Sequence, residues 1–461
     1  MGGGILQLVA RGATDVNLTG NPQVTFFKSV YKRYTNFAME EVLQSFNGDL
    51  SADEFKIETK LNHNGDLLRK IWLEIDLPES PTEEGDADFC NWSNGTGYAY
   101  IKEASLKIGT QTIDTQYSEW LDVWNEFTDV YRNETILVNK NRTTTAVLLG
   151  ATGKKVKKLK MFVPLQFWFC KNTGAALPLI SLQYIDVKLS ITFRSLNSII
   201  NSGKRNVVTG KGNIGNQTTV PDVKLYCEYI YIDKDERRKF ATSKHEYLIE
   251  QVQKIGPIPA SKIIDLDFNH SIKEIIWVFR DKNRGEKNVS DSTNNTNITK
   301  NKNGKVSIAG NDYFNYNSNH QRYSDNIRTN ITHEPFDNAT ILFNNQERFP
   351  KRPATYFRMV QPLNFHSRVP DKNVYVYSFS FNPEYYQPTG CCNFTKLDAK
   401  LKFDDAQNMF DKSNTGNMIS GDSSSGIIKD NIMDIIIFAT NYNLYKISNG
   451  VGALAYTNTR V

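Results

Sequence analysis

The residue patterns that could carry phosphate chemistry or acid–base catalysis are incomplete in this chain. The stretch Gly150–Lys155 looks like a phosphate-binding loop, but its second glycine comes too early and a lysine stands where Ser or Thr would bind magnesium. Asp404-Asp405 and Glu83-Glu84 are contiguous pairs, whereas the two carboxylates of a hydrolase flank the bond that they cleave. No Gly-x-Ser-x-Gly elbow is present. These patterns lead us to expect no enzyme activity.

The histidines and cysteines form no metal or redox motif in the sequence. The six histidines include no HExxH motif and no partner for a CxxC pair, so we expect no metal ion and no other cofactor. Cys391 and Cys392 are adjacent, which suits neither zinc binding nor redox exchange, and we interpret them as core or turn residues. The five cysteines are an odd number without regular spacing, which favours synthesis in a reducing, intracellular compartment.

Composition excludes several other classes of protein. The 461 residues carry a formal charge of only +5, too small to argue for nucleic-acid binding, so we expect no sequence-specific nucleic acid partner. Hydrophobic residues at 39% and aromatic residues at 12% exclude a disordered chain and a coiled coil. No apolar run approaches the roughly 18 residues that a membrane-spanning helix needs. The length predicts two or three domains.

Alternation of apolar and polar residues, typical of half-buried antiparallel strands, dominates the pattern. Clear cases are 71–77, 185–193, 375–381 and 397–403. Helical spacing is scarce, and its best example is the short amphipathic set Tyr117, Trp120, Leu121, Trp124 and Phe127. Short strands separated by Gly, Asn and Pro predict an all-β protein built of sandwiches or barrels.

The chain also resembles itself, with echoes kept in order. A tandem duplication is the natural interpretation, and two equivalent β-domains follow from it. The paired segments are Ile71–Leu73 with Ile276–Val278 (offset 205), Ala104–Gln111 with Ala339–Gln346 (offset 235), and Phe167–Phe169 with Phe379–Phe381 and Asp186–Leu189 with Asp398–Leu401 (both offset 212).

The changes in offset locate two insertions, which we expect to lie on the surface because such polar segments cannot bury themselves. One is the Asn-rich stretch 281–330 in the second half, and the other is the Lys-rich stretch Lys154–Lys160 in the first. We interpret the lysine run as a solvated loop, with contact to an acidic partner as the alternative.

A basic and aromatic arm precedes the first strands. Its aromatic residues could stack on nucleic-acid bases or sit at a membrane interface. We favour a third interpretation, in which they anchor the arm on its own or a neighbouring β-domain. The candidate assembly residues are Phe26, Phe27, Tyr31, Lys32, Arg33, Tyr34 and Phe37.

Four segments resemble the major capsid proteins of nucleocytoplasmic large DNA viruses, most closely those of marseillevirus-like and chlorovirus-like members. The N-terminal motif runs from Asp15 to Phe37 as DVNLTGNPQVTFFKSVYKRYTNF. The central motif is PLQFWFCKN with ALPLI and LQY, between Pro164 and Tyr184. KEIIWV at Lys273–Val278 resembles the opening of the second half, and Ala439–Tyr456 the end.

The resemblance implies an all-β fold of two tandem eight-stranded jelly-roll sandwiches, a double jelly roll with short helices and long surface loops. The domains would be an N-terminal arm at 1–25, a first jelly roll at 26–236 and a second at 237–461. The implied function is a structural major capsid protein, without enzyme activity, that self-assembles as pseudo-hexagonal homotrimeric capsomers into an icosahedral shell.

The same resemblance implies partners and a location. The homotrimer would contact neighbouring capsomers, penton and minor capsid proteins, with possible proximity to an internal viral membrane. The protein would reside in the virion capsid, after synthesis and assembly in the host cytoplasm. We expect 281–330 to form part of an outward-facing tower and the 1–40 arm to lie at the base of the capsomer.

Two other functions stay open on the residues alone. A carbohydrate-binding β-sandwich would need aromatic and acidic residues clustered at one end of a sandwich. A nucleic-acid-binding protein would use the basic and aromatic arm and would show steep salt dependence.

Overall fold

A computed structural model describes most of the chain. The described residues are 3–51, 53–79, 90–129, 137–140, 158–202, 220–281, 298–300, 306–309, 313–314, 316, 334–404 and 433–457. The Gly150–Lys155 stretch and most of the Asn-rich 281–330 insertion lie outside them. The chain divides into two compact units, Met1–Phe37 and Ala38–Val461. The first contains helices α1 (Gly3–Val9) and α2 (Ala13–Thr19).

The first sandwich consists of two four-stranded antiparallel sheets. In one, the neighbouring strands are β1 (Phe37–Gln44), β10 (Asp222–Ile232), β3 (Leu67–Leu77) and β7 (Leu159–Pro164), in that order. In the other, the order is β2 (Phe55–Lys60), β8 (Val187–Phe193), β5 (Ile101–Ile108) and β6 (Gln111–Tyr117).

The second sandwich repeats this plan. Its first sheet has the order β11 (His245–Pro259), β22 (Met433–Ser448), β13 (Ser271–Asp281) and β19 (Val374–Ser378), with β20 (Cys392–Asn393) and β23 (Val451–Leu454) attached. Its second sheet has the order β12 (Ile263–Asp265), β21 (Ala399–Asp404), β16 (Asn338–Phe343) and β17 (Gln346–Glu347), with β18 (Arg352–Pro353) attached.

Both sandwiches therefore have the same strand order. If the eight main strands of each are numbered along the chain, the two sheets run 1-8-3-6 and 2-7-4-5 in both halves. This double Greek key is the jelly roll, so the predicted all-β fold of two tandem jelly rolls is confirmed. The sequence echoes fall on equivalent strands, with β3 matching β13, β5 matching β16 and β8 matching β21.

Short helices and minor strands complete the described part of the chain. The helix α4 (Ser118–Thr128) confirms the predicted helix. The other elements are α3 (Thr96–Tyr100), α7 (Trp168–Lys171), α8 (Lys234–Thr242), α9 (Gln361–Phe365), the π-helical turn η5 (Tyr356–Val360), the 3₁₀ turns η1 (Thr173–Ala175), η2 (Leu179–Ser181), η3 (Leu196–Ser198) and η6 (Phe394–Lys396), and the strand pairs β4 (Cys90–Trp92) with β9 (Ile200–Ser202) and β14 (Ile298–Lys300) with β15 (Val306–Ala309).

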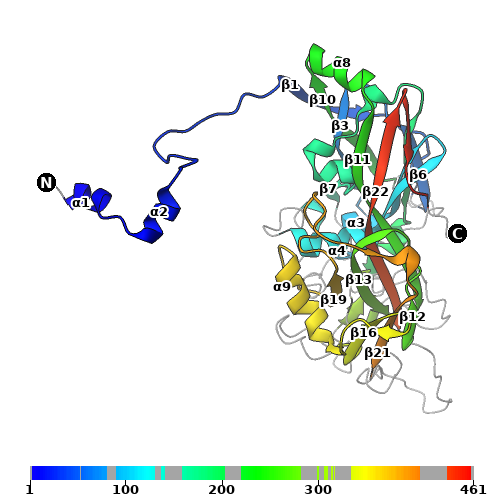
Figure 1. Ribbon diagram of the computed structural model, residues 1–461. Coiled ribbons are helices and arrows are strands. Elements are labelled where there is room, and N and C mark those ends of the chain that lie inside the picture. The colour runs from blue at the N-terminus through cyan, green and yellow to red at the C-terminus, as the bar shows by residue number, and fades with distance from the viewer. Residues whose placement is uncertain are drawn as a thin grey trace, which may run out of the picture. The chain divides into compact units, whose positions relative to one another are not determined.

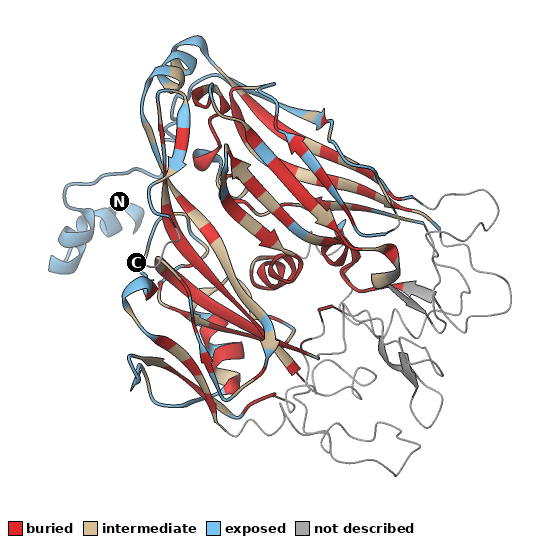
Figure 2. Ribbon diagram, turned by 90° about the vertical axis from the view of Figure 1, so that its right-hand side faces the viewer, coloured by how far each residue is buried: buried red, intermediate tan, exposed pale blue. Residues whose placement is uncertain are grey.

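Each sandwich has its own core, but the first core extends onto the second sandwich. On β13, Ile275 and Trp277 face the interior of the second sandwich, whereas Ile276 and Val278 belong to the first core. Figure 2 shows buried ribbon inside both sandwiches and in the region between them. The long strands β11 and β22 run past both sandwiches in Figure 1, so they link the two cores.

The β11–β22 pair passes from one sandwich to the other and contains a one-residue shift in register. The β11–β22 register shifts between Ile255 and Ile258. Gly256 lies in the shift with a φ of 96°, and a Cβ there would come within 2.5 Å of the Ile435 carbonyl oxygen. Only glycine combines this backbone conformation with so close an approach.

One expectation from the sequence needs correction. The insertion 281–330 does not lie wholly on the surface, because Tyr313, Phe314 and Tyr316 are buried in the first core. These aromatic residues attach the polar insertion to the first sandwich.

The complete burial of α4 was not predicted. Its residues from Ser118 to Phe127 are all buried, polar ones included. The polar side of this helix faces the second sandwich instead of water.

Candidate functional site

The predicted assembly arm exposes its aromatic residues. Phe26 and Phe27 are 93% and 98% exposed, and Tyr31 and Tyr34 are also exposed. The Tyr34 ring packs edge-on against Phe37, the first residue of β1, with 6.1 Å between ring centres. Lys32 and Arg33 are exposed as well. The arm therefore presents alternating aromatic and basic side chains without burying any of them.

The described end of the lysine run is paired with acids of the adjacent strand. Lys160 Nζ lies 2.5 Å from Glu74 Oε1, and Lys158 Nζ lies 3.6 Å from Asp76 Oδ2. Lys160 belongs to β7, which pairs with β3 at the edge of the sheet. This part of the lysine run therefore lies in an edge strand. The remaining lysines of the run, at positions 154, 155 and 157, lie outside the described residues.

The most heavily charged buried region lies where α4 meets the second sandwich. Trp120 is fully buried, and its ring lies 5.5 Å from that of Phe438 on β22. Polar contacts accompany this packing, since Asp114 Oδ1 accepts a hydrogen bond of 3.0 Å from the Val252 amide. The Gln251 side chain also donates to the Ile113 carbonyl oxygen. The two jelly rolls are joined by specific bonds as well as by apolar contact.

Glu119 is the centre of the first buried charge cluster. Its carboxylate lies 3.3 Å from Lys254 Nζ, 3.1 Å from Arg280 Nη1 and 3.8 Å from Arg194 Nη2. Burial by itself would raise the pKa of Glu119, but the three cations outweigh burial and lower the pKa to about 2. Lys254 and Arg280 come from β11 and β13, so a single acid of the first sandwich holds two strands of the second.

Asp122 and Glu126 form the second cluster, one turn further along α4. Lys140 Nζ lies 2.8 Å from each carboxylate, and Lys372 Nζ lies 2.8 Å from Asp122. Arg368 adds a contact of 3.6 Å to Glu126. Burial would raise the pKa of Glu126, but Lys140 and Lys372 lower it to about 2. The helix thus supplies acids along one side, and the second sandwich supplies most of their cations.

A buried histidine closes the same interface. His366 Nε2 lies 3.1 Å from Glu274 Oε2, and Nδ1 lies 3.1 Å from Glu384 Oε1. Its ring stacks on Phe127 of α4 with centres 4.3 Å apart. Burial would lower the pKa of His366, but the two glutamates outweigh it and raise the pKa to about 9. The imidazole is therefore a cation at neutral pH, held between two carboxylates.

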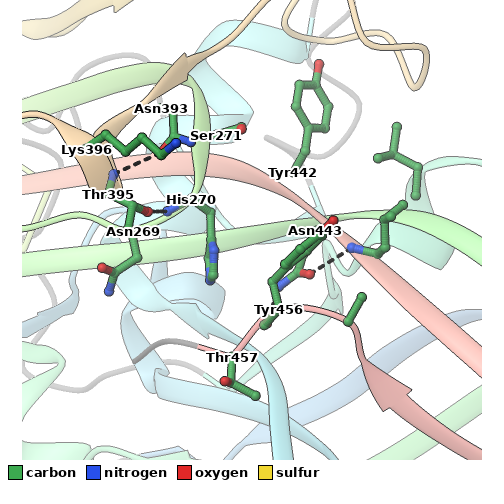
Figure 3. Close-up of a pocket in the computed structure, with 13 residues that line it drawn as sticks. Asn269, His270, Ser271, Asn393, Thr395, Lys396, Tyr442, Asn443, Tyr456 and Thr457 are labelled. Atoms are coloured by element: carbon green, nitrogen blue, oxygen red, sulfur yellow. Dashed lines mark hydrogen bonds between the residues drawn. The ribbon is translucent and has the colours of Figure 1, made fainter. Parts of the chain in front are cut away.

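A cavity of about 630 Å³ lies beside the second sandwich (Figure 3). Eight of its thirteen lining residues have an amide or hydroxyl side chain, and His270 and Lys396 supply its nitrogen bases. Several of these groups already bond to each other, for example the His270 amide to Thr395 Oγ1 at 2.9 Å. The lining contains no Asp or Glu, so it lacks the acids that the carbohydrate-binding alternative requires.

A smaller groove of about 370 Å³ comes nearer to that alternative. Trp168, Tyr385 and Tyr386 line it together with Glu250 and Glu384. Both carboxylates are engaged, because Glu250 pairs with the buried Lys273 at 2.5 Å and the half-buried Lys171 at 3.3 Å, and Glu384 pairs with the buried histidine. Burial would raise the pKa of both carboxyls, but these partners outweigh it and lower the pKa, so both acids stay ionised and are poor general acids.

Other chemistry has little support in the described part of the chain. It contains no cluster of three or more His, Cys, Asp or Glu residues that could hold a metal ion. Cys170, Cys227, Cys391 and Cys392 are free thiols. Cys392 packs against the second core and Cys391 is exposed, as expected for core and turn residues. No helix of the described residues is long and apolar enough to cross a membrane.

The charge clusters on α4 were not found from the sequence. Glu119, Asp122 and Glu126 recur at helical spacing, which is typical of a solvated helix face. Lys254 and Arg280 lie more than 130 residues away, and no local pattern links them to the helix. One feature of the sequence could have indicated this interface, namely the unbroken apolar run Ile435–Phe438 on β22. A strand that is apolar on both sides must be covered on both sides.

Family models cover nearly the whole chain. A model described as "Major capsid protein N-terminus" matches residues 25–233, and one described as "Large eukaryotic DNA virus major capsid protein" matches residues 236–453. The boundary between the matches falls within or next to α8, which connects the two sandwiches.

Individual proteins agree with these models. The chain is 35% identical to the major capsid protein of Pyramimonas orientalis virus, over 99% of this chain and 100% of that protein. It is 34% identical to the major capsid protein of Paramecium bursaria Chlorella virus 1, with the same coverage. A solved structure titled "PBCV-1 virus capsid, quasi-atomic model" matches with a TM-score of 0.69 at 27% identity, over 94% of this chain and 100% of that one.

Proposed function

The chain belongs to the family of major capsid proteins of large eukaryotic DNA viruses, and we propose that it builds the virion shell as a homotrimeric capsomer. The structural role of a shell protein requires no catalysis, and we propose that the chain has none. The observation that carries the proposal is the tandem pair of jelly rolls with identical strand order. Three such chains supply six similar sandwiches, which suit a pseudo-hexagonal tile in an icosahedral lattice.

Physical reasoning supports a ring of chains. Each chain presents its first sandwich at one side and its second at the other, so contacts between copies join unlike surfaces. Such heterologous contacts close into rings when the rotation between copies is suitable. The experiment is native mass spectrometry of the full chain, which should give a trimer of about 158 kDa, three times 52.6 kDa. A monomer at every concentration would contradict the proposal.

We propose that the arm connects capsomers to other shell components. Phe26, Phe27, Tyr31 and Tyr34 are exposed, and side chains of this kind gain most by burial against a partner. The proposed partners are neighbouring capsomers and the penton and minor capsid proteins, at the base of the capsomer near an internal viral membrane. Removal of residues 1–36 should leave the trimer intact and abolish lattice assembly, as seen by electron microscopy. Normal shells from the truncated chain would exclude this role.

The remaining proposals concern the domains, the outer surface and the site of assembly. We propose domain boundaries at 25/26 and 236/237, the second of which falls within α8. The part of 281–330 beyond its buried aromatic anchors is proposed to form the outward-facing tower. Synthesis and assembly are proposed to take place in the host cytoplasm, which agrees with the four free thiols of the described residues.

A further inference from the structure

The cavity of Figure 3 lies at the end of the second sandwich where β13 begins. Ser271, the first residue of β13, lines it together with residues of β11, of β22 and of the segment that follows β23. The insertion 281–330 leaves β13 at its other end. Since β13 has 11 residues, the cavity and the insertion lie roughly 35 Å apart along the strand.

Two loops of the second sandwich form one wall of this cavity and are bonded to each other. The His270 amide donates a hydrogen bond of 2.9 Å to Thr395 Oγ1, and the His270 carbonyl oxygen accepts one of 3.1 Å from the Phe394 amide. Ser271 pairs with Asn393 in the β13–β20 ladder. These bonds hold His270 at a φ of 67°, a left-handed conformation that is unfavourable for residues with a Cβ. The wall is therefore formed before any ligand binds.

The charge of the lining is positive. Among the described residues the lining has no Asp or Glu, and it includes Lys396, which is exposed. Asp398, the acid closest to this lysine along the chain, pairs with Lys400 instead, at 3.3 Å. The ammonium group of Lys396 has no ion pair with any described residue, so it is available to an anionic ligand.

Polar side chains of the lining face a common space. In Figure 3, the side chains of Asn269 and His270 point toward the space beside Tyr456 and Thr457. These four residues come from two separate parts of the chain, the loop before β13 and the segment after β23. A ligand in this space would contact both parts at once.

The equivalent end of the first sandwich is closed. The offset of 205 that relates Ile71–Leu73 to Ile276–Val278 places Asp66 at the position of Ser271. Asp66 accepts a hydrogen bond of 3.0 Å from the Ile232 amide and pairs with Arg237 of α8 at 3.0 Å. Phe240 of α8 packs on a small apolar cluster at the same end. In the second sandwich a serine replaces this acid, and no helix follows β22 in the described part of the chain.

The lining suits a ligand that carries a phosphate group and several hydroxyl groups. Ammonium and imidazole groups bind phosphate, and amide and hydroxyl side chains both donate to and accept from alcohols. A nucleotide would also need an aromatic surface for its base. The Tyr442 ring is only 8% exposed and lies 5.7 Å from Lys273 Nζ, which leaves Tyr456 as the accessible ring of the lining. The chemistry therefore favours a phosphorylated polyol.

We propose that this cavity binds a phosphorylated polyol, either a free sugar or inositol phosphate or the head group of an inositol lipid. Lys396 and His270 contact the phosphate group, and the amide and hydroxyl side chains contact the polyol. The site lies within one chain and requires no second copy. Its direction rests on the outward tower proposed above, because the end of β13 opposite the insertion then faces the inside of the shell.

Calorimetric titration of the full chain tests the class of ligand. Myo-inositol 1-phosphate should bind at least tenfold more tightly than either inorganic phosphate or myo-inositol. Equal binding of inorganic phosphate would reduce the cavity to a simple anion site, and equal binding of myo-inositol would exclude a role for the two bases. Tighter binding of adenosine monophosphate would overturn the choice of a polyol. No binding of inositol phosphate by the folded chain would overturn the site.

Substitutions test the location. Lys396→Gln should weaken binding of inositol phosphate at least tenfold, and Ser271→Asp, which introduces the acid of the first sandwich, should abolish it by repulsion. The matched control is Lys262→Gln, at an exposed lysine of the second sandwich outside the lining, which should bind as the wild type does. Unchanged melting temperatures would show that the variants are folded. Equal effects of Lys396→Gln and Lys262→Gln would overturn the assignment.

Vesicles separate the two sources of the ligand. Stronger sedimentation with phosphatidylinositol vesicles than with phosphatidylserine vesicles, lost in Lys396→Gln, would assign a lipid head group. No such preference, together with binding of free inositol phosphate, would assign a soluble ligand. Native mass spectrometry of the same samples keeps this proposal apart from the trimer. A monomer that binds inositol phosphate would refute the trimer and support the site, whereas a trimer that does not bind it would refute the site alone.

Discussion

The outer faces of the two sandwiches differ although their strands have the same order. The first outer face is the side of the β1-β10-β3-β7 sheet that points away from its own core, and the second outer face is the matching side of the β11-β22-β13-β19 sheet. On β3, buried residues alternate with half-exposed ones, so only one side of the strand is apolar and enclosed. On β22, the residues from Ile435 to Asn443 are buried without a break. The difference arises from what covers each sheet, since α4 packs on the second outer face and nothing equivalent within the described chain packs on the first.

The ion pairs of the two outer faces also differ in how far they are buried. On the second outer face, Glu119 and its cations are almost fully enclosed, and removal of one member leaves the others unsatisfied in a medium of low polarity. On the first outer face, Lys160 is about half-exposed and Glu74 is only partly covered, so water and salt screen the attraction between them. The comparison predicts a graded series of effects.

The largest effect is expected from Trp120→Ala. The indole is fully buried between α4 and β22, and its loss leaves a cavity that the surrounding strands cannot close. We expect a loss of about 3–5 kcal/mol in the free energy of unfolding, measured by guanidinium denaturation in dilute solution. Trp72→Ala, on the half-exposed face, is the matched control and should lose much less. Equal losses would mean that the two faces do not differ in the single chain.

Glu119→Gln should come next. The change removes the negative charge but keeps the shape, so Lys254 and Arg280 remain buried without their carboxylate. Breaking a buried charge network in this way costs about 3 kcal/mol. The measurement is the denaturation midpoint, with Glu246→Gln, in an exposed pair with Lys446, as the control. A loss as small as that of the control would show that the cluster does not hold the sandwiches together.

The histidine at the interface predicts a dependence on pH. The folded pKa of His366, about 9, exceeds its ordinary value of 6.5, so its contribution to stability is complete below pH 6.5 and is lost as the pH rises through 9. We expect a loss of about 3 kcal/mol over this window in the wild-type chain. Denaturation at several pH values should show a flatter profile for His366→Gln. The same slope in both proteins would exclude this histidine as the cause.

The smallest effect is expected on the first outer face. Lys160→Gln removes one member of a half-exposed pair, and such pairs contribute about 0.2–1 kcal/mol. Raising the salt concentration should reduce even this difference, because the charges are accessible to ions. A loss above 2 kcal/mol, insensitive to salt, would place this pair in the same class as Glu119 and remove the contrast between the faces.

The strands and their duplication could be predicted from the sequence because both produce patterns among residues that are close along the chain. The alternation at 71–77 and the echo of Ile71–Leu73 by Ile276–Val278 depend only on neighbouring residues and on order along the chain. The helix at Trp120 and Trp124 was predicted for the same reason. Its burial was not, because the enclosure of Glu119 depends on cations from β11 and β13, which only the tertiary fold brings together.

The insertion 281–330 shows the limit of composition as a guide. Its many Asn residues predicted a surface segment, yet Tyr316 donates a hydrogen bond of 3.2 Å to Asp122 in the interior. Three aromatic residues within four positions were a visible signal, since aromatic side chains gain most from burial. The polar composition of the stretch as a whole concealed these three aromatic residues. The arm residues Phe26 to Phe37 were found by sequence, and their role in assembly stays a prediction.

The strand β22 has a consequence for how this protein is made. Ile437 belongs to the second core and Ile447 to the first, so one strand near the end of the chain contributes to both. The eight main strands of the first sandwich end with β10 at Ile232, so during synthesis they leave the ribosome some 200 residues before β22. Until β22 follows, the part of the first core that it covers stays open to water. A chain stopped before Met433 would lack a central strand of the second sandwich and would leave this apolar part of the first core exposed.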